Sequence, residues 1–323
     1  MVKRLFIVPL LLLMLVSSSY ALDIVYPGDG TYVIHSDFLI IQAGPNVDGL
    51  TLDIAGEKSD LFDISGAEYK AAFGDFLIVQ PSWAPGKNTV KVEAYKAGKK
   101  VSDKTTSFFF QNNPLEPPPQ GFKRFVMHTP EQEAFCVGCH NMNPTPDQLE
   151  MVGEKNPCAS CHKRMLNHKY VHGPAGAWQC AYCHDSKSRP AKYQPRSLNG
   201  DLCAECHEDI IEKFKASKLL HGPVAVSMCG ICHDSHASDY PAQVVLPVNK
   251  LCLGCHEGVD KGPHVITGFT GKQHPLEGVP DPSRPQRDLA CSGCHDPHSG
   301  SARYYFQGGV TSRMMLCQRC HQK

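Results

Sequence analysis

The chain contains no cysteine before Cys136, although it has 16 cysteines in all and the last is Cys320. Any fold of the N-terminal part must therefore be stable without disulfides. Neither charge is in excess, since 32 Lys and Arg balance 32 Asp and Glu. This balance argues against a nucleic-acid-binding protein, which would show a strong basic excess. Charged residues at 20% and aromatic residues at 8% also argue against a disordered acidic or basic tail.

Long apolar runs are absent after residue 21, so no later segment is expected to span a membrane. Before that point, Lys3 and Arg4 precede an apolar stretch from Leu5 to Val16, and small residues follow up to Ala21. The stretch is shorter than the ~20 residues that a membrane span needs. We expect residues 1–21 to be a signal peptide, so that the mature protein is exported to the periplasm or the cell surface. An N-terminal membrane anchor is the alternative.

Residues 22–110 have the pattern of an all-β domain. Alternation is clearest over residues 89–95, where Val90, Val92 and Ala94 share one face. About ninety residues with some seven short strands predict an immunoglobulin-like sandwich. Further strand candidates are rich in β-branched and aromatic residues; they are Asp23–Tyr26, Tyr32–Ile41, Leu50–Ile54, Phe76–Gln80 and Thr105–Phe110.

The composition changes after residue 110. Residues 111–120 contain Pro114 and the run Pro117-Pro118-Pro119, which favours an extended linker between two domains. From Gly121 onward, regular periodicity almost vanishes and Gly, Pro, His and Cys become frequent. With so few Val, Ile and Phe, residues 121–323 could not bury enough apolar surface to fold unaided. We expect short helices and loops wrapped round a cofactor.

Every cysteine belongs to a Cys-x-x-Cys-His pentad, the signature of covalent attachment of haem c. Two thiols bind one porphyrin edge, and the adjacent His becomes the proximal iron ligand. The predicted attachment residues for eight haems are Cys136, Cys139, Cys158, Cys161, Cys180, Cys183, Cys203, Cys206, Cys229, Cys232, Cys252, Cys255, Cys291, Cys294, Cys317 and Cys320. The predicted proximal ligands are His140, His162, His184, His207, His233, His256, His295 and His321.

The alternatives for these cysteines are eight structural disulfides or four zinc sites. Neither requires a His after each cysteine pair. His makes up 17 of the 323 residues, so chance would place one after a given pair roughly once in twenty cases. It follows the pair in all eight cases, which favours haem strongly.

A second count concerns the distal side of each iron. Nine His lie outside the pentads, and His35 is expected to be an ordinary strand residue of the β domain. The remaining eight match eight irons and are candidate distal ligands: His128, His168, His172, His221, His236, His264, His274 and His298. A Met ligand at one or two irons is the alternative, because a Met ligand raises the potential; the available residues are Met127, Met142, Met165, Met228, Met314 and Met315.

The pentads form a repeat. His128, His172 and His221 each stand eight residues before the first Cys of a pentad, and a second pentad of different flanking sequence follows each. His274 leads a fourth copy with a longer insertion. Residues 121–323 are thus expected to be four tandem units of two haems.

This pattern resembles the doubled Cys-x-x-Cys-His family of multihaem c-type cytochromes, over Gly121 to Lys323 and not over the β domain. The resemblance implies electron transfer through closely stacked bis-His haems in anaerobic or extracellular respiration, with other redox proteins as partners. One departure stands out: the second unit has Lys187 where later units show Asp-x-His, at His236 and His298.

We therefore expect a non-catalytic electron carrier. A first alternative is a multihaem reductase with one open iron, for which a haem of the second unit beside Lys187 is the best candidate site. A second alternative is a subunit of a conducting filament, in which the β domain is the interaction module; Trp83 is then a candidate binding aromatic, although a packed aromatic is favoured.

Overall fold

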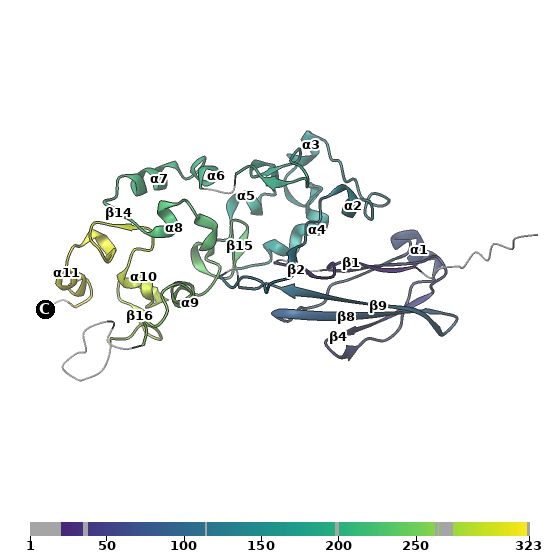
Figure 1. The fold of residues 1–323 in the computed structure, drawn as a ribbon. Helices are drawn as coiled ribbons and strands as arrows, with labels where there is room; N and C mark the ends of the chain where they lie inside the picture. Colours follow the sequence, from purple (N-terminus) through teal and green to yellow (C-terminus); the bar gives the residue numbers. More distant parts are fainter. Residues whose placement is uncertain are drawn as a thin grey trace, which may run out of the picture. The chain divides into compact units, whose positions relative to one another are not determined.

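The computed structural model describes residues 21–34, 38–113, 115–197, 200–261, 264 and 274–321. The expected signal peptide lies outside the described residues except for its last residue, and so do His35 and Pro114. The chain divides into two compact units, one made mainly of residues up to Phe110 and the other mainly of residues from Gln111 onward (Figure 1). Each unit is described by itself.

The first unit is β-rich. A smaller sheet has the order β1-β3-β7 and a larger one contains β2-β9-β8-β4-β5, with β6 also paired to β4. One short helix, α1 (Ala67–Phe73), begins after Gly66 and ends at Gly74, whose φ of 58° suits glycine. The strands are β1 (Leu22–Tyr26), β2 (Thr31–Val33), β3 (Leu39–Ala43), β4 (Gly49–Ile54), β5 (Glu57–Lys58), β6 (Phe62–Asp63), β7 (Phe76–Val79), β8 (Gly86–Lys96) and β9 (Lys99–Phe110).

An ordinary apolar core supports this unit. Val90, Val92 and Ala94 are fully buried on one face of β8, so the face predicted from their alternation is confirmed. Trp83 is 8% exposed and packs edge-on against Phe108, with 4.8 Å between the ring centroids. Trp83 is therefore a packed core side chain, which is the interpretation favoured from sequence, and it offers little surface for binding.

The predicted strand Tyr32–Ile41 is wrong as a single element. The structure divides this region into β2 in the larger sheet and β3 in the smaller one. Leu39 and Ile41 are buried in β3, while Ile40 between them is less buried. Local β propensity marks both pieces but carries no information on which sheet each joins.

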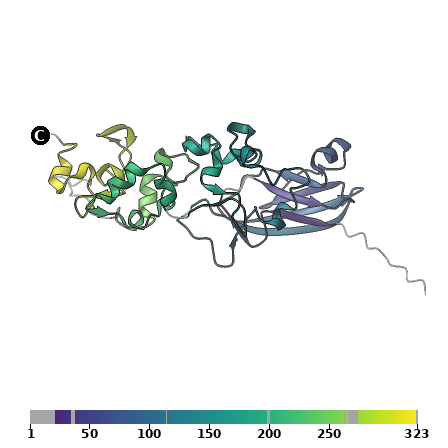
Figure 2. The same ribbon diagram turned by 90° about the horizontal axis from the view of Figure 1, so that it is seen from above.

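The second unit consists of short helices, short strands and loops around the pentads (Figures 1 and 2). Its longest helix, α7, has eight residues. The α-helices are α2 (Pro130–Glu133), α3 (Pro146–Leu149), α4 (Ala159–His162), α5 (Gly173–Gly176), α6 (Asp201–Ala204), α7 (Glu208–Lys215), α8 (Gly222–Ala225), α9 (Val248–Leu253), α10 (Cys291–Cys294) and α11 (Arg313–Cys317). The strands are β10 (Lys123–Arg124), β11 (Tyr170–Val171), β12 (His184–Asp185), β13 (Gln194–Pro195), β14 (Leu219–Leu220), β15 (Ala237–Ser238), β16 (Pro280–Asp281), β17 (Arg284–Asp288) and β18 (Ser299–Gly300).

Strand pairs join successive repeats of the second unit. β11 pairs with β15 and β14 pairs with β18, so each pair links the start of one repeat to a loop of the next. The chain colours also run in order from teal to yellow through this unit in both views (Figures 1 and 2). Within the described ranges, we find no helix with the length and apolar character needed to cross a bilayer.

Candidate functional site

The pentads share a local backbone geometry. In seven of them the backbone N–H of the His donates to the carbonyl of the first Cys, four residues earlier, at 2.9–3.1 Å. A bond of this span closes one helical turn, so both thiols and the imidazole are presented by the same turn. All sixteen cysteines are free thiols in the structure. This local geometry is compatible with attachment of one haem at each of these seven pentads.

The fold brings seven predicted proximal His rings opposite seven of the spare His rings. In each pair the ring centroids are 5.9–6.2 Å apart. The pairs are His162 with His128, His184 with His236, His207 with His172, His233 with His298, His256 with His221, His295 with His264 and His321 with His274.

This spacing fits one iron between the two rings. A His nitrogen binds a transition metal at about 2.0–2.1 Å, and a ring centre lies about 1 Å behind its nitrogen, so two trans ligands have centroids roughly 6 Å apart. The observed range matches that value in all seven pairs. Among the described residues, moreover, no three His, Cys, Asp or Glu side chains form a group that could hold a metal ion by themselves. The donor set therefore suits a haem iron with two axial nitrogens.

The second ring nitrogen of many of these His is held by a partner. Ligating His usually donate this N–H to a carboxylate or a carbonyl, which orients the ring. His184, His233 and His295 use the carbonyl of the residue nine positions later, at 2.7–2.8 Å from Nδ1. Two of the predicted distal His have a carboxylate as the partner of Nδ1. Nδ1 of His128 lies 3.1 Å from Glu133, and Nδ1 of His236 lies 3.2 Å from Asp234. Nε2 is then left to face an iron.

The surrounding protein also favours the neutral form of the imidazole, which is the form that binds a metal. Desolvation lowers the pKa of His162 to about 4, and the neighbouring His128 contributes in the same direction. Desolvation likewise lowers the pKa of His184 and of His298. Protons are therefore weak competitors at these sites.

The pentads follow one another in space in the order of the chain. In every step from one pentad to the next, a thiol is close enough to a thiol of the neighbouring pentad to change its pKa. The hydrogen bond between Cys158 and Cys180 lowers the pKa of Cys180 to about 7, and the bond between Cys252 and Cys291 does the same for Cys291. The neighbouring thiols are Cys136 and Cys161, Cys158 and Cys180, Cys183 and Cys206, Cys203 and Cys229, Cys232 and Cys255, Cys252 and Cys291, and Cys294 and Cys320.

Two predicted ligands are not brought together. In the described part of the chain, His140 has no His ring opposite it, and His168 contacts no other ring. His168 instead places Nδ1 3.2 Å from a carboxylate oxygen of Asp239. The count of eight spare His therefore does not translate into eight His pairs within the described residues.

Sequence reasoning missed the polar side chains that anchor the pentads. Asn156 is buried; its amide donates to the carbonyls of Leu149, Met151 and Trp178, and its oxygen accepts from the N–H of Cys158. Asn249 similarly accepts from the N–H of Cys291. The only sequence signal was an Asn shortly before a pentad, which is too common to interpret.

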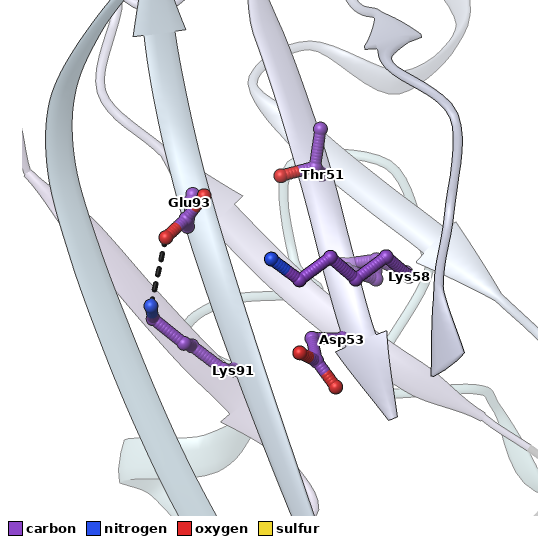
Figure 3. A pocket seen from close by; sticks show the side chains of 6 residues that line it. Thr51, Asp53, Lys58, Lys91 and Glu93 are labelled. Carbon is purple, nitrogen blue, oxygen red and sulfur yellow. Dashed lines mark ion pairs between the residues drawn. The ribbon is translucent and has the colours of Figure 1, made fainter. Parts of the chain in front are cut away.

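The first unit carries a polar pocket on β4, β5 and β8 (Figure 3). Lys91 Nζ lies 2.8 Å from Glu93 Oε1, and Lys100 Nζ lies 3.1 Å from the same atom. Hydrogen bonds from Lys91, Lys100 and Tyr95 lower the pKa of Glu93 to about 2. The pocket is lined by charged and polar side chains and by Leu52, and no His or Cys lines it, so it differs in chemistry from the His pairs of the second unit.

Comparison with solved structures gave only weak likenesses. They include fibronectin(III)-like modules of CbhA from Clostridium thermocellum (14% identity, 28% of this chain, 96% of that chain, TM-score 0.22) and CopC from Methylosinus trichosporium OB3b (17%, 26%, 86%, 0.21). A β-glucuronidase from Parabacteroides merdae (14%, 29%, 12%, 0.24) is similar to the same degree. Such TM-scores assign neither a fold nor a function. The search of curated proteins found no match.

The comparison with protein families was specific. The family model of the doubled CXXCH motif matches residues 172–212, 221–261 and 284–323, which are the second, third and fourth repeats. The first repeat, with Cys136 and Cys158, lies outside these matches. The paired motifs indicate covalently bound haem c and electron transfer. The C-terminal region of this chain belongs to the doubled CXXCH family of multihaem c-type cytochromes.

Proposed function

We propose that this protein is an exported c-type cytochrome with eight haems that passes electrons along an ordered series of them. Covalent haem supplies one-electron redox chemistry at each iron. The observation that carries the proposal is the combination of seven His pairs at one-iron spacing with pentads that adjoin in chain order. Neighbouring redox centres in a row are what electron transfer over distance requires.

The residues that would hold the haems follow from this geometry. Each pentad provides two thioether bonds and a proximal His. Seven of the spare His provide the distal ligand of the irons whose proximal His they face. Two axial His leave an iron with no position for a substrate, so these seven haems serve as carriers and not as reaction centres.

The first unit then has a separate task. We propose that it is an immunoglobulin-like sandwich that orients one end of the haem series against a redox partner or a second copy of this chain. Its apolar core is complete without haem, and its surface pocket is polar. Residues 111–120 would be the linker, and the periplasm or the cell surface is the expected location, because haem c is attached outside the cytoplasm.

The direct test is a count of haems and electrons. We expect mass spectrometry of the mature protein to show eight covalent haems, one for each pentad. A potentiometric titration followed through the haem absorption bands should then show eight electrons taken up per chain. Six or fewer haems in fully matured protein would contradict the proposal, and so would eight haems that do not exchange electrons with one another.

The pairing of ligands makes a separate prediction. Replacing His221 with Ala should leave all haems attached but convert one iron, that of the pentad ending in His256, to the high-spin state, because the ring 5.9 Å away is lost. Electron paramagnetic resonance of the ferric protein measures this change. His168→Ala is the matched control, since His168 faces no other ring among the described residues, and it should leave the spectrum unchanged. An unchanged spectrum in His221→Ala together with a high-spin iron in His168→Ala would show that the pairing is wrong.

A further inference from the structure

One iron remains without an assigned distal ligand. It belongs to the first pentad, Cys136–His140. In the described part of the chain, the His140 ring takes part in no ring contact and in no hydrogen bond to a carbonyl nine residues later. The other three pentads that open a repeat have both features, as His184, His233 and His295 show. The first pentad therefore departs from the pattern.

The second and third repeats reveal a rule for this class of pentad. His184 of the second repeat faces His236 of the third, and His233 of the third faces His298 of the fourth. In both cases the distal ring comes from an Asp-x-His turn directly after the corresponding pentad of the next repeat. In each turn the His backbone N–H donates to the Asp side chain, at 2.8 Å for His236 and 2.9 Å for His298.

Lys187 occupies the same place in the turn of the second repeat. Its backbone N–H donates to Asp185 Oδ1 at 2.8 Å, the same bond that positions His236 and His298. The loop that follows has the same length in all three repeats, because the proximal His bonds to the carbonyl nine residues later in each. By the rule above, residue 187 should face the first haem of the first repeat.

Direct contacts place this loop beside the first pentad. Lys192 Nζ lies 2.6 Å from the carboxylate of Glu133, just before the pentad, and donates to the carbonyl of Met142, just after it, at 2.6 Å. Its backbone N–H donates to the carbonyl of His128 at 2.9 Å. In the later repeats a backbone bond also joins the leading His of one repeat to the turn of the next, but there the His donates: the N–H of His172 donates to the carbonyl of His236. In the first repeat the leading His128 accepts instead, and the donor is Lys192 and not the turn residue.

We propose that the Lys187 amine is the distal ligand of the haem attached at Cys136 and Cys139, opposite His140. The Lys187 side chain is exposed and forms no ion pair within the described ranges, so nothing else there engages its nitrogen. Ser188 and Arg189 form no strand pair in the described part of the chain, unlike β15 and β18, which follow the turns of the later repeats. The longer side chain of Lys would compensate for a turn that lies farther from its iron. This inference rests on the proposed haem attachment.

The proposal corrects the position expected from sequence. Lys187 follows the pentad of the second repeat, and sequence alone associated it with a haem of that repeat. In the structure, the His of the turn after one pentad faces the proximal His of the preceding repeat, as His236 and His298 do. The chain would then carry one His/Lys haem at the N-terminal end of a series of bis-His haems.

Two variants of the full mature protein test this. In Lys187→Arg the positive charge and length are retained, but an Arg guanidinium stays protonated and offers no lone pair to a metal. We expect electron paramagnetic resonance to show eight low-spin ferric haems in the unaltered protein and one high-spin haem in Lys187→Arg. Lys187→His should restore eight low-spin haems, and the restored signal should resemble those of the bis-His sites.

Three other results would contradict either the ligand proposal or the proposed function, and they can be told apart. One high-spin haem in the unaltered protein would mean an open iron and would overturn the proposal. Eight low-spin haems that persist in Lys187→Arg would assign the ligand to another residue and would overturn it equally. Fewer than eight covalent haems by mass, measured on the same samples, would instead contradict the proposed function.

Discussion

Without haem attachment, residues 111–323 are expected to remain unfolded while residues 22–110 fold. Of the buried hydrophobic side chains among the described residues, 16 lie before residue 111 and seven lie after it, namely Leu149, Ala159, Trp178, Ala191, Ala237, Leu289 and Phe306. Ordering a backbone costs about 1–2 kcal/mol per residue in conformational entropy. Seven buried apolar side chains, three of them Ala, cannot offset that cost over two hundred residues. The haem faces must supply the missing apolar surface, and folding is then coupled to cofactor binding.

The test is a chain that begins at Leu22 and is produced in the cytoplasm, where haem c is not attached. Two-dimensional amide spectra should show dispersed signals for the first unit and a collapsed set for the second. The haem-loaded protein is the control and should show ordered structure throughout. Dispersed signals from residues such as Trp178 and Phe306 in the haem-free chain would show that the second unit has a sufficient core of its own.

Deleting the first unit should not change the number or the spectrum of the haems. Removing residues 22–110 is expected to leave eight covalent haems and an unchanged haem spectrum, because the seven His pairs found among the described residues all lie within residues 128–321. What should be lost is rapid electron exchange with the physiological partner, or self-association, if the first unit orients that contact. Mass spectrometry counts the haems, and stopped-flow absorption and sedimentation measure the exchange and the assembly.

A point variant provides the matched control for this deletion. Trp83→Ala removes a core ring that packs on Phe108 and should destabilise the first unit by about 3–5 kcal/mol. The haem spectrum should again be unaffected. A haem lost from either variant, or an iron that changes its spin state, would show that the first unit contributes to a haem site and that the boundary near residue 110 is misplaced.

Much of the site could be predicted from local sequence. The pentads needed no tertiary information, because both thiols and the proximal His lie within one helical turn, as in Cys158–His162. The buried face of β8 was equally readable, since alternation over 89–95 depends only on strand geometry. The repeat unit was visible because identical spacings recur along the chain, at His128, His172 and His221.

Only the tertiary structure decided which His face one another. His184 and His236 belong to different repeats, and their approach depends on the β11–β15 pairing and on the Asp234 turn, neither of which has a local signature. The same holds for Lys187, whose role is set by the repeat that its turn contacts and not by the pentad that precedes it. Sequence determined the chemistry of each ligand, because that is a property of single residues. Packing within and between repeats determined which His rings face one another, because each pair joins segments that only the folded chain brings together.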